Sequence, residues 1–441
     1  MITVDRASLD VDTLRALWPS LLDDERADAF ALLSGDDAQI FFSSLSAADH
    51  AGLVRLMAGG EAVVWMRFLA PDDAADLLQS LHEDERSRFR DMLDESTRRE
   101  VDALLAYAED EAGGLMSPRY VRVRPDATVD VAIRYLRQQT RNNPETLYYI
   151  YVLNSGQQLL GVLSLRELFA APGEARIDDL MHVNPVVVNE TTDQEEVARL
   201  IEQYDLLAVP VVDDQGRMKG IVTVDDIVDV IREEATEDIH KLGGTEALGE
   251  PYLDVGFLRM FKKRGGWLSV LFLGEMLTAT AMSYFEGEVA KAVVLAMFVP
   301  LIISSGGNSG SQAATLIVRS LALSELRLRD WSRVLLRELK SGLTLGTWLG
   351  FIGFVRVELW QYLGFFDYGE HATLVAVTVW LSLIGVVSFG SIAGSMLPFL
   401  LRWLGFDPAT SSAPLVATLV DVTGLVIYFT VAALILSGTL L

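Results

Sequence analysis

Five long apolar stretches dominate the C-terminal part of the chain. They cover about residues 267–284, 289–318, 335–357, 373–401 and 414–441. A helix rises about 1.5 Å per residue, so roughly 20 apolar residues cross the hydrocarbon core of a bilayer, which is about 30 Å thick. Each stretch approaches or exceeds that length. The pattern therefore predicts five membrane-spanning helices.

A strict twelve-residue period marks the first hundred residues. Acidic side chains in the first turn of a helix stabilise it, because they lie near the positive end of the helix dipole. Short helices that stack at a fixed period build a superhelical domain. We therefore expect an acidic, all-α superhelical N-domain. The period consists of apolar residues at Leu21, Leu33, Leu45, Met57, Leu69, Leu81 and Leu93, with acids at the fifth position of most units, at Glu25, Asp37, Asp49, Glu61, Asp73 and Glu85.

A second repeat has a longer period. The sequence Leu-Met-Ser-Pro at 115–118 recurs as Leu-Met-His-Val-Asn-Pro at 180–185, and residues 161–168 recur as 220–227. Alternating apolar segments between these motifs predict strands. Each unit reads as strand, helix, strand, turn, strand, helix. This organisation resembles a tandem pair of CBS domains, α/β modules that usually sense adenosyl ligands or metal ions; a purely structural pair is the alternative.

Charge is distributed unevenly along the chain. The sequence holds 61 Asp and Glu against 36 Lys and Arg, a net charge of -25, and nearly all of the excess lies before residue 265. A strongly negative surface repels phosphate, which argues against nucleic acid as a partner. The absence of cysteine excludes disulfides and thiolate metal sites. The first 30 residues are acidic where a signal peptide would be apolar, so we expect none.

Basic residues set the expected orientation. They precede the first apolar stretch, lie around the connection of the second and third, and lie between the fourth and fifth. Such connections face the cytoplasm. We therefore expect a multi-pass protein of the cell (inner) membrane with cytoplasmic N-terminal domains and its C-terminus outside. The residues are Lys262, Lys263, Arg264, Arg327, Arg329, Arg333, Arg337, Lys340 and Arg402.

Two carboxylates lie within the apolar stretches. Asp421 follows Pro414 by seven residues, about 10 Å along a helix, and Glu275 lies in the first stretch. An ionisable residue at membrane depth is costly and marks a functional site by default. The alternatives are that Asp421 is satisfied by hydroxyls such as Thr418, and that Glu275 faces headgroups or a neighbouring helix.

The second apolar stretch combines a proline with several glycines. Pro300, Gly306, Gly307 and further glycines are expected to loosen the helix and expose backbone carbonyl groups. Asn308 and Gln312 lie one turn apart, so they share a face and offer neutral oxygens to a hydrated ion. The alternative is a close helix-packing site made of small residues.

Residues 300–312 and 414–424, the CBS pair and the acidic N-domain together resemble the MgtE family of magnesium channels, over essentially the whole chain. The resemblance implies a homodimer with one pore at its axis and cytosolic domains that sense Mg²⁺. It also implies that Asp421 is the pore carboxylate, with Ala417 and Thr418 on the adjacent turn. Mg²⁺ dehydrates reluctantly, so two symmetry-related carboxylates suit a hydrated ion that must still be released.

The same resemblance implies regulatory Mg²⁺ sites. Like charges repel at low Mg²⁺, and bridging ions would favour closure. We therefore expect a magnesium-selective channel or transporter that imports Mg²⁺ and is closed by cytosolic Mg²⁺. Ile40 stands where the family has another sensing glutamate. The implied regulatory ligands are Asp72, Asp76, Glu195, Asp205, Asp226, Asp229, Glu234, Glu237 and Asp238, with Asp407 between the fourth and fifth stretches.

The expected architecture is multidomain. It comprises the N-domain over 1–110, the CBS pair over 111–238, a connecting or plug helix over 239–264 and a five-helix α transmembrane pore domain over 265–441. The first CBS copy ends at about residue 175 and the second begins at about residue 176. In the CBS pair, Tyr149 and Arg166 match positions that contact nucleotide in ATP-binding relatives, whereas Glu167 and Leu206 depart from the pattern. We therefore expect ATP binding to be weak or absent.

Other functions are weighed against the same residues. A divalent-cation exchanger needs the same pore site and stays open as the alternative, as do Mn²⁺, Co²⁺, Ni²⁺ and Ca²⁺ as further ions. An anion channel would present cationic groups in its pore. A membrane aspartyl protease needs a second mid-span aspartate, and the five histidines show no His-Glu-x-x-His spacing. We therefore expect a transport protein and not an enzyme.

Overall fold

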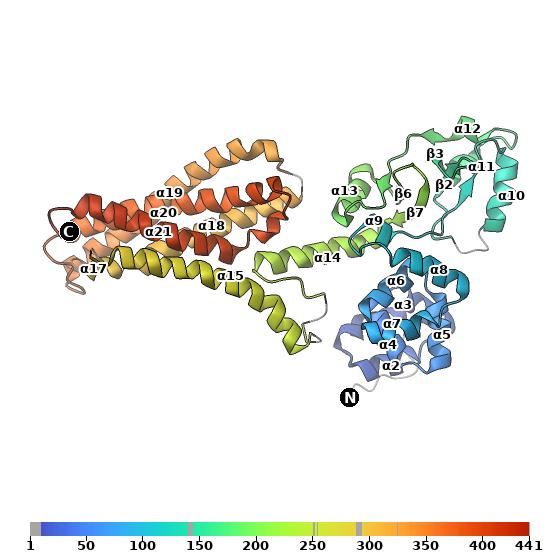
Figure 1. Cartoon of the computed structure of the whole chain (residues 1–441), viewed down its shortest axis with the longest axis horizontal. Coiled ribbons are helices and arrows are strands. Elements are labelled where there is room, and N and C mark those ends of the chain that lie inside the picture. Colours follow the sequence, from blue (N-terminus) through green and yellow to red (C-terminus); the bar gives the residue numbers. More distant parts are fainter. Residues whose placement is uncertain are drawn as a thin grey trace. The chain divides into compact units, whose positions relative to one another are not determined.

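The computed structural model describes residues 10–139, 144–249, 252, 253, 255–287, 293–323 and 325–440. The chain divides into two compact units, Met1–Glu233 and Glu234–Leu441. The first contains short helices and two small sheets, and the second contains long helices (Figure 1).

The N-terminal helices repeat at twelve-residue intervals. From α2 onward to α8, each helix begins twelve residues after the one before it. Periodic residues such as Leu69 and Leu81 end one helix and are buried in the shared core. Ser34, Ser46 and Asp94 cap the helices that follow them by accepting backbone N–H groups. The all-α domain is confirmed, with helices α1 (Val11–Leu17), η1 (Trp18–Ser20), α2 (Asp23–Phe30), α3 (Gly35–Phe42), α4 (Ala47–Leu56), α5 (Gly59–Phe68), α6 (Pro71–Ser80), α7 (Glu83–Arg90) and α8 (Glu95–Leu104).

Two small sheets follow, as the second repeat predicts. In each, one strand pairs in parallel with the next, which pairs antiparallel with the third. The first sheet has the order β1-β2-β3-β4 and the second β5-β6-β7. The elements are α9 (Ala112–Leu115), β1 (Arg122–Val123), α10 (Val129–Gln139), β2 (Tyr149–Leu153), β3 (Leu159–Ser164), α11 (Leu165–Ala170), α12 (Ile177–Leu180), β4 (His182–Val183), β5 (Val188–Asn189), α13 (Gln194–Tyr204), β6 (Ala208–Val212), β7 (Met218–Thr223) and α14 (Val224–Leu242).

The repeated motifs of the two sheets contact each other. A Cβ atom at Gly220 would lie 2.8 Å from Met116 Cγ. A Cβ atom at Gly161 would lie 2.9 Å from Met181 Sδ and 2.7 Å from the His182 carbonyl oxygen. Each Leu-Met segment therefore packs on the glycine of a strand, and the segment before the first copy covers the second copy. This crossed packing explains why both motifs recur together.

The segment after the second sheet differs from the single connecting helix expected over 239–264. Helix α14 continues to Leu242 and is followed by Gly244, whose φ of +73° suits glycine and ends the helix. The next long helix, α15, begins at Phe257. The expected helix is thus divided between the end of α14 and the start of α15, and the described residues 243–249 between them are not helical.

Five helices of the second unit are long and apolar enough to cross a membrane, which confirms the five predicted spans. Helix α20 packs against α18, α19 and α21, and α15 packs along α21 (Figure 1). The elements are α15 (Phe257–Tyr284), α17 (Val293–Ala296), α18 (Val299–Ala322), η3 (Leu328–Asp330), α19 (Trp331–Leu363), α20 (Ala372–Trp403), η4 (Pro408–Thr410) and α21 (Ala413–Leu436).

The glycines of α18 serve close packing. The expected loosening of this segment is wrong, because α18 is one continuous helix from Val299 to Ala322. A Cβ atom at Gly390 or Gly394 of α20 would overlap the backbone of Gly306 or Gly310 of α18. Backbones can approach this closely only where both helices carry small residues. The helix-packing alternative therefore accounts for Gly306 and Gly310.

The crossed packing of the CBS copies predicts a sensitive glycine. Gly220→Ala adds a methyl group against Met116 and should destabilise the β7 region by about 1–3 kcal/mol, the usual cost of overpacking. Hydrogen exchange of the β7 amides in the full-length protein measures the change. Gly60→Ala is the matched control, because a Cβ atom there has no neighbour within 4 Å. Equal exchange in both variants would contradict the crossed contact.

Candidate functional site

Asp421 lies at membrane depth in α21. The helix starts after Ser412, whose hydroxyl accepts the backbone N–H of Leu415, so the start of the helix and hence the height of Asp421 are defined. Asp421 is half-buried, and its side chain lies within hydrogen-bonding reach of Glu275. Thr418 donates its hydroxyl proton to the Pro414 carbonyl oxygen at 3.0 Å. The neighbour of Asp421 is thus the second intramembrane carboxylate and not the Thr418 hydroxyl.

Glycine brings α15 and α21 together at this point. A Cβ atom at Gly274 would lie 2.8 Å from Thr418 Cγ2, so only glycine allows the observed approach without a shift. The next residue is Glu275, which is exposed in a single chain. Helix α15 has no buried residue in the described chain. The two acids that sequence analysis singled out therefore meet on a side of α15 and α21 that this chain leaves largely uncovered.

The two amide side chains of α18 lie on its outer face. Asn308 and Gln312 are exposed, whereas Gly306 and Gly307 are buried. A Cβ atom at Gly307 would lie 3.6 Å from Ala417 Cβ, so α18 packs at Gly307 against α21, the helix that carries Asp421. Exposed amides on an apolar helix need polar surroundings, either water or protein.

A second group of carboxylates forms inside the first unit. Asp72 and Asp76 on α6 face Asp226 near the start of α14, and Glu145 lies close to both Asp72 and Asp226. Burial, together with neighbouring carboxylates, raises the pKa of Asp72 well above its usual range. Burial first and then Asp73, Asp226 and other acids raise the pKa of Asp76 to about 8. Burial also raises the pKa of Asp226 to about 7.

Among these carboxylates, Asp72 is buried with an oxygen that lacks a hydrogen-bond partner among the described residues. Its side chain is only 6% exposed, and Oδ1 is buried without a hydrogen-bond partner in the part of the chain that the structure describes. A buried negative charge without a counter-charge is strongly unfavourable. A divalent cation would suit this donor set. Among the described residues, however, no three acids or histidines are close enough to form a ready-made metal cage.

The other expected regulatory residues of the first unit lie apart. Asp229 follows Asp226 by one turn of α14 and is near enough to Asp73 to raise its pKa. Glu195 and Asp205 are exposed on and after α13, and Asp205 has a φ of +50°. Ile40 is an exposed side chain of α3.

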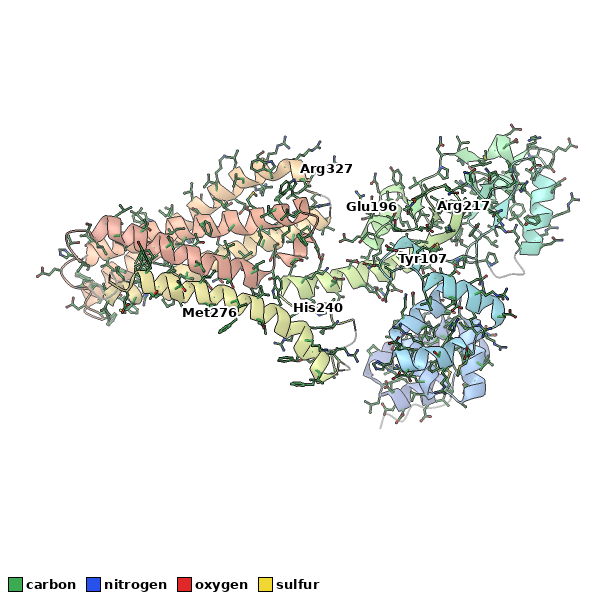
Figure 2. All side chains as sticks on the ribbon, viewed as in Figure 1. Tyr107, Glu196, Arg217, His240, Met276 and Arg327 are labelled. Atoms are coloured by element: carbon green, nitrogen blue, oxygen red, sulfur yellow. The ribbon has the colours of Figure 1, made fainter. Side chains whose placement is uncertain are left out.

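In the second unit, Glu237 and Asp238 lie near the end of α14, three and four residues after Glu234. Lys241 contacts Glu237 and also Asp407, with Nζ 2.7 Å from Asp407 Oδ2. Burial, and then the nearby Asp407, raise the pKa of Asp238. Figure 2 labels His240, the residue just before Lys241.

Two important side chains were missed from the sequence. Lys241 could have been found, because it follows Glu237 by four residues on one helix, the spacing of a helical ion pair. Glu145 lies in the loop before β2 and carries no periodic signal. Only the fold brings it next to Asp72.

The positions linked to nucleotide binding are partly engaged within the chain. Tyr149 is half-buried in β2 and Arg166 is exposed on α11. Glu167 accepts the backbone N–H of Ser164 at 2.8 Å and lies 2.7 Å from His182 Nε2; these contacts lower the pKa of Glu167 to about 2. A carboxylate held in this way is less available to a ribose hydroxyl.

Three family models match successive parts of the chain. The divalent cation transporter model MgtE matches residues 299–431. The MgtE intracellular N domain matches residues 9–110. The CBS domain matches residues 112–174 and 177–233.

Individual relatives agree. The magnesium transporter MgtE of Thermus thermophilus is 44% identical over 428 residues, which are 96% of this chain and 93% of that protein. The MgtE of Bacillus subtilis is 31% identical over 94% of this chain and 90% of its own length. A solved cytosolic domain of the Mg²⁺ channel MgtE with ATP is 42% identical, with a TM-score of 0.48 over 51% of this chain and 92% of that chain. The resemblance identified from the sequence is confirmed, and the chain belongs to the MgtE family of divalent cation transporters.

Proposed function

We propose that this protein is a magnesium channel that imports Mg²⁺ through a pore whose carboxylate is Asp421. The observation that carries the proposal is a carboxylate beside a second one, Glu275, in helices otherwise apolar enough to cross a membrane. Such groups are costly in a bilayer unless they serve an ion path. The relatives named magnesium transporters support Mg²⁺ as the ion.

The pore is completed by a second copy of the chain. Asn308 and Gln312 are exposed on α18, and α15 has no buried residue among those described. A symmetric partner would cover these faces and place two Asp421 carboxylates around one axis. The protein is therefore proposed to work as a homodimer.

The site suits a hydrated ion. Mg²⁺ keeps its water ligands tightly, so carboxylate, amide and backbone carbonyl oxygens act on the water shell. Asp421 supplies charge, and Ala417, Thr418, Asn308 and Gln312 line the path. The expected pore-lining Gly306 and Gly307 are buried and let the helices beside the path pack closely. Because these contacts are made through water, the ion can leave as well as enter.

The cytosolic acids close the channel when Mg²⁺ binds them. The Asp72 group supports this proposal. Burial and neighbouring acids raise the pKa values of Asp72, Asp76 and Asp226. Asp72 Oδ1 has no hydrogen-bond partner among the described residues. Mg²⁺ would replace protons as the counter-charge. Raising free Mg²⁺ from Kd to ten times Kd adds about 1 kcal/mol per site to the bound state, so several sites give a steep response.

The remaining assignments follow the same proposal. Basic residues such as Arg327, which Figure 2 labels, favour a cytoplasmic side for their connections and thus an external C-terminus. Glu167, engaged with Ser164 and His182, supports weak or absent ATP binding. A divalent-cation exchanger remains the alternative function, and it would show coupled uptake without unitary currents.

Removal of the pore charge should abolish conduction. In inside-out patches with Mg²⁺ as the carrier, Asp421→Asn should lower the current at least about tenfold, which corresponds to about 1.4 kcal/mol of ion stabilisation. Glu370→Gln, a change at an exposed acid between α19 and α20, is the matched control and should conduct as the unmodified protein does. Full Mg²⁺ current in Asp421→Asn would refute the pore assignment. Vesicle uptake without unitary currents would favour the exchanger.

The Asp72 group predicts a pH-dependent contact between α6 and α14. Asp76 and Asp226 have folded-state pKa values of about 8 and 7, both above the ordinary 3.8. Protonated carboxylates therefore stabilise the contact fully below about pH 4, and this stability is lost as the pH rises through 7 to 8. Without Mg²⁺, the protection factors of the α6 amides, which correct for the intrinsic rise of exchange with pH, should be lower at pH 8.5 than at pH 6.

Mg²⁺ should slow that exchange at pH 8.5, because it replaces the lost protons. Asp76→Asn should reduce both the pH effect and the Mg²⁺ effect. Asp84→Asn, at an exposed acid of α7, is the control and should change neither. If the protection factors of the α6 amides change with neither pH nor Mg²⁺, these acids do not act as a sensor.

A further inference from the structure

Lys241 joins two carboxylates from different elements. Glu237 lies one turn earlier on α14, and Asp407 precedes η4 in the connection between α20 and α21. The ammonium group lies 2.7 Å from Asp407 Oδ2 and also contacts Glu237 Oε1. The Lys241 side chain is 29% exposed. Burial alone would lower the pKa of Lys241, but the hydrogen bonds to Asp407 and Glu237 raise it, so the residue is a permanent cation.

Asp407 connects this cation to the helix that carries Asp421. Its other oxygen, Oδ1, accepts the backbone N–H of Ala409 at 2.8 Å and so begins η4. Three residues after η4, α21 starts at Ala413. Asp407 thus caps η4 with one carboxylate oxygen and accepts a hydrogen bond from Lys241 with the other.

Neighbouring contacts hold the same junction. Gly244, in a left-handed conformation, packs against Trp267 and Pro414, where a Cβ atom would lie 2.9 Å and 3.2 Å from their nearest atoms. Trp267 Nε1 donates to Ser412 Oγ at 3.3 Å. The end of α14 therefore meets both α15 and the beginning of α21 within a few residues.

The junction also contains open space. A cavity of about 380 Å³ is lined by Glu237, Lys241, Thr245, Trp267 and Thr410, among others. Side chains do not fill this volume, so apolar packing contributes less here than in a closed core. The ion pairs of Lys241 join α14 to the connection that precedes α21 beside this open space.

We propose that Lys241 is a positioning residue of the transport path, a tethered cation that occupies the place between Glu237 and Asp407 which a divalent cation would otherwise take. Two carboxylates facing each other repel unless a positive charge lies between them. The lysine supplies that charge without Mg²⁺ and holds the end of α14 beside the start of α21. A divalent cation can bridge the same two carboxylates only by displacing the ammonium group. Its effect on gating rests on the proposed function, but the contact itself does not.

The test uses the absence of cysteine in this chain. Thr245→Cys places a single thiol at the cavity, and its rate of labelling by a maleimide reports how firmly α14 is held. In the full-length protein without Mg²⁺, adding Lys241→Met should raise this rate several-fold, because Glu237 and Asp407 then repel. Mg²⁺, which binds carboxylate oxygens, should restore slow labelling in Lys241→Met when added in large excess and should have little effect in the parent.

Matched variants separate electrostatics from a general loss of structure. Lys241→Arg keeps the charge and should label slowly, and Lys262→Met removes an exposed lysine of α15 and should match the parent. Adding Glu237→Gln to Lys241→Met removes the repulsion, so labelling should be slow without Mg²⁺ and should no longer respond to it. Parent-like labelling of Lys241→Met, or a fast rate that Mg²⁺ does not change, would overturn the proposal. Failure of the Asp421 current experiment would leave this result unaffected.

Discussion

A carboxylate that leaves water needs a positive partner, and this requirement governs every proposed site of the protein. Burial disfavours the ionised form by several kcal/mol unless a counter-charge compensates. In the Asp72 group, burial and neighbouring acids raise the pKa of Asp72, and its Oδ1 has no hydrogen-bond partner among the described residues, so the group suits a proton or a metal ion. Glu237 and Asp407 have Lys241. Asp421 lies beside a second carboxylate, Glu275. These three arrangements suit a sensor, a fixed contact and a cation path respectively.

Close backbone contacts at glycine bring these groups into place. Gly161 and Gly220 allow the methionine motifs to cross between the CBS copies, and their sheets position the start of α14. In the membrane unit, Gly306 and Gly310 pack against α20, and Gly274 draws α15 onto α21 beside Asp421. Small residues thus allow close contacts in both units. In the first unit they allow the crossed sheet contact. In the membrane unit they allow helix packing, because apolar burial alone does not draw helices together in a bilayer.

Much of the fold could be read from periodicity. The twelve-residue period became a helix start every twelve residues from α2 to α8, because each short helix needs the next to bury its apolar face. The apolar stretches became the five long helices, since length and hydrophobicity alone decide whether a helix can span. Asp421 and Glu275 could also be identified, as charges stand out in an apolar run. The loosened helix at 300–312 was wrong, because glycine permits both a break and close packing and only the neighbouring helix decides between them.

The sequence by itself determined the domain types, the five apolar helices, the family and the residues with unusual chemistry. Local patterns and motifs encode these properties within a few turns of chain. Only the tertiary structure decided which charges meet. Glu145 next to Asp72, Glu275 next to Asp421, and Lys241 between Glu237 and Asp407 join positions up to 166 residues apart. Only the i, i+4 pair of Glu237 and Lys241 carries a periodic signal. The other contacts depend on the packing of whole elements, whereas the sequence pattern describes each element separately.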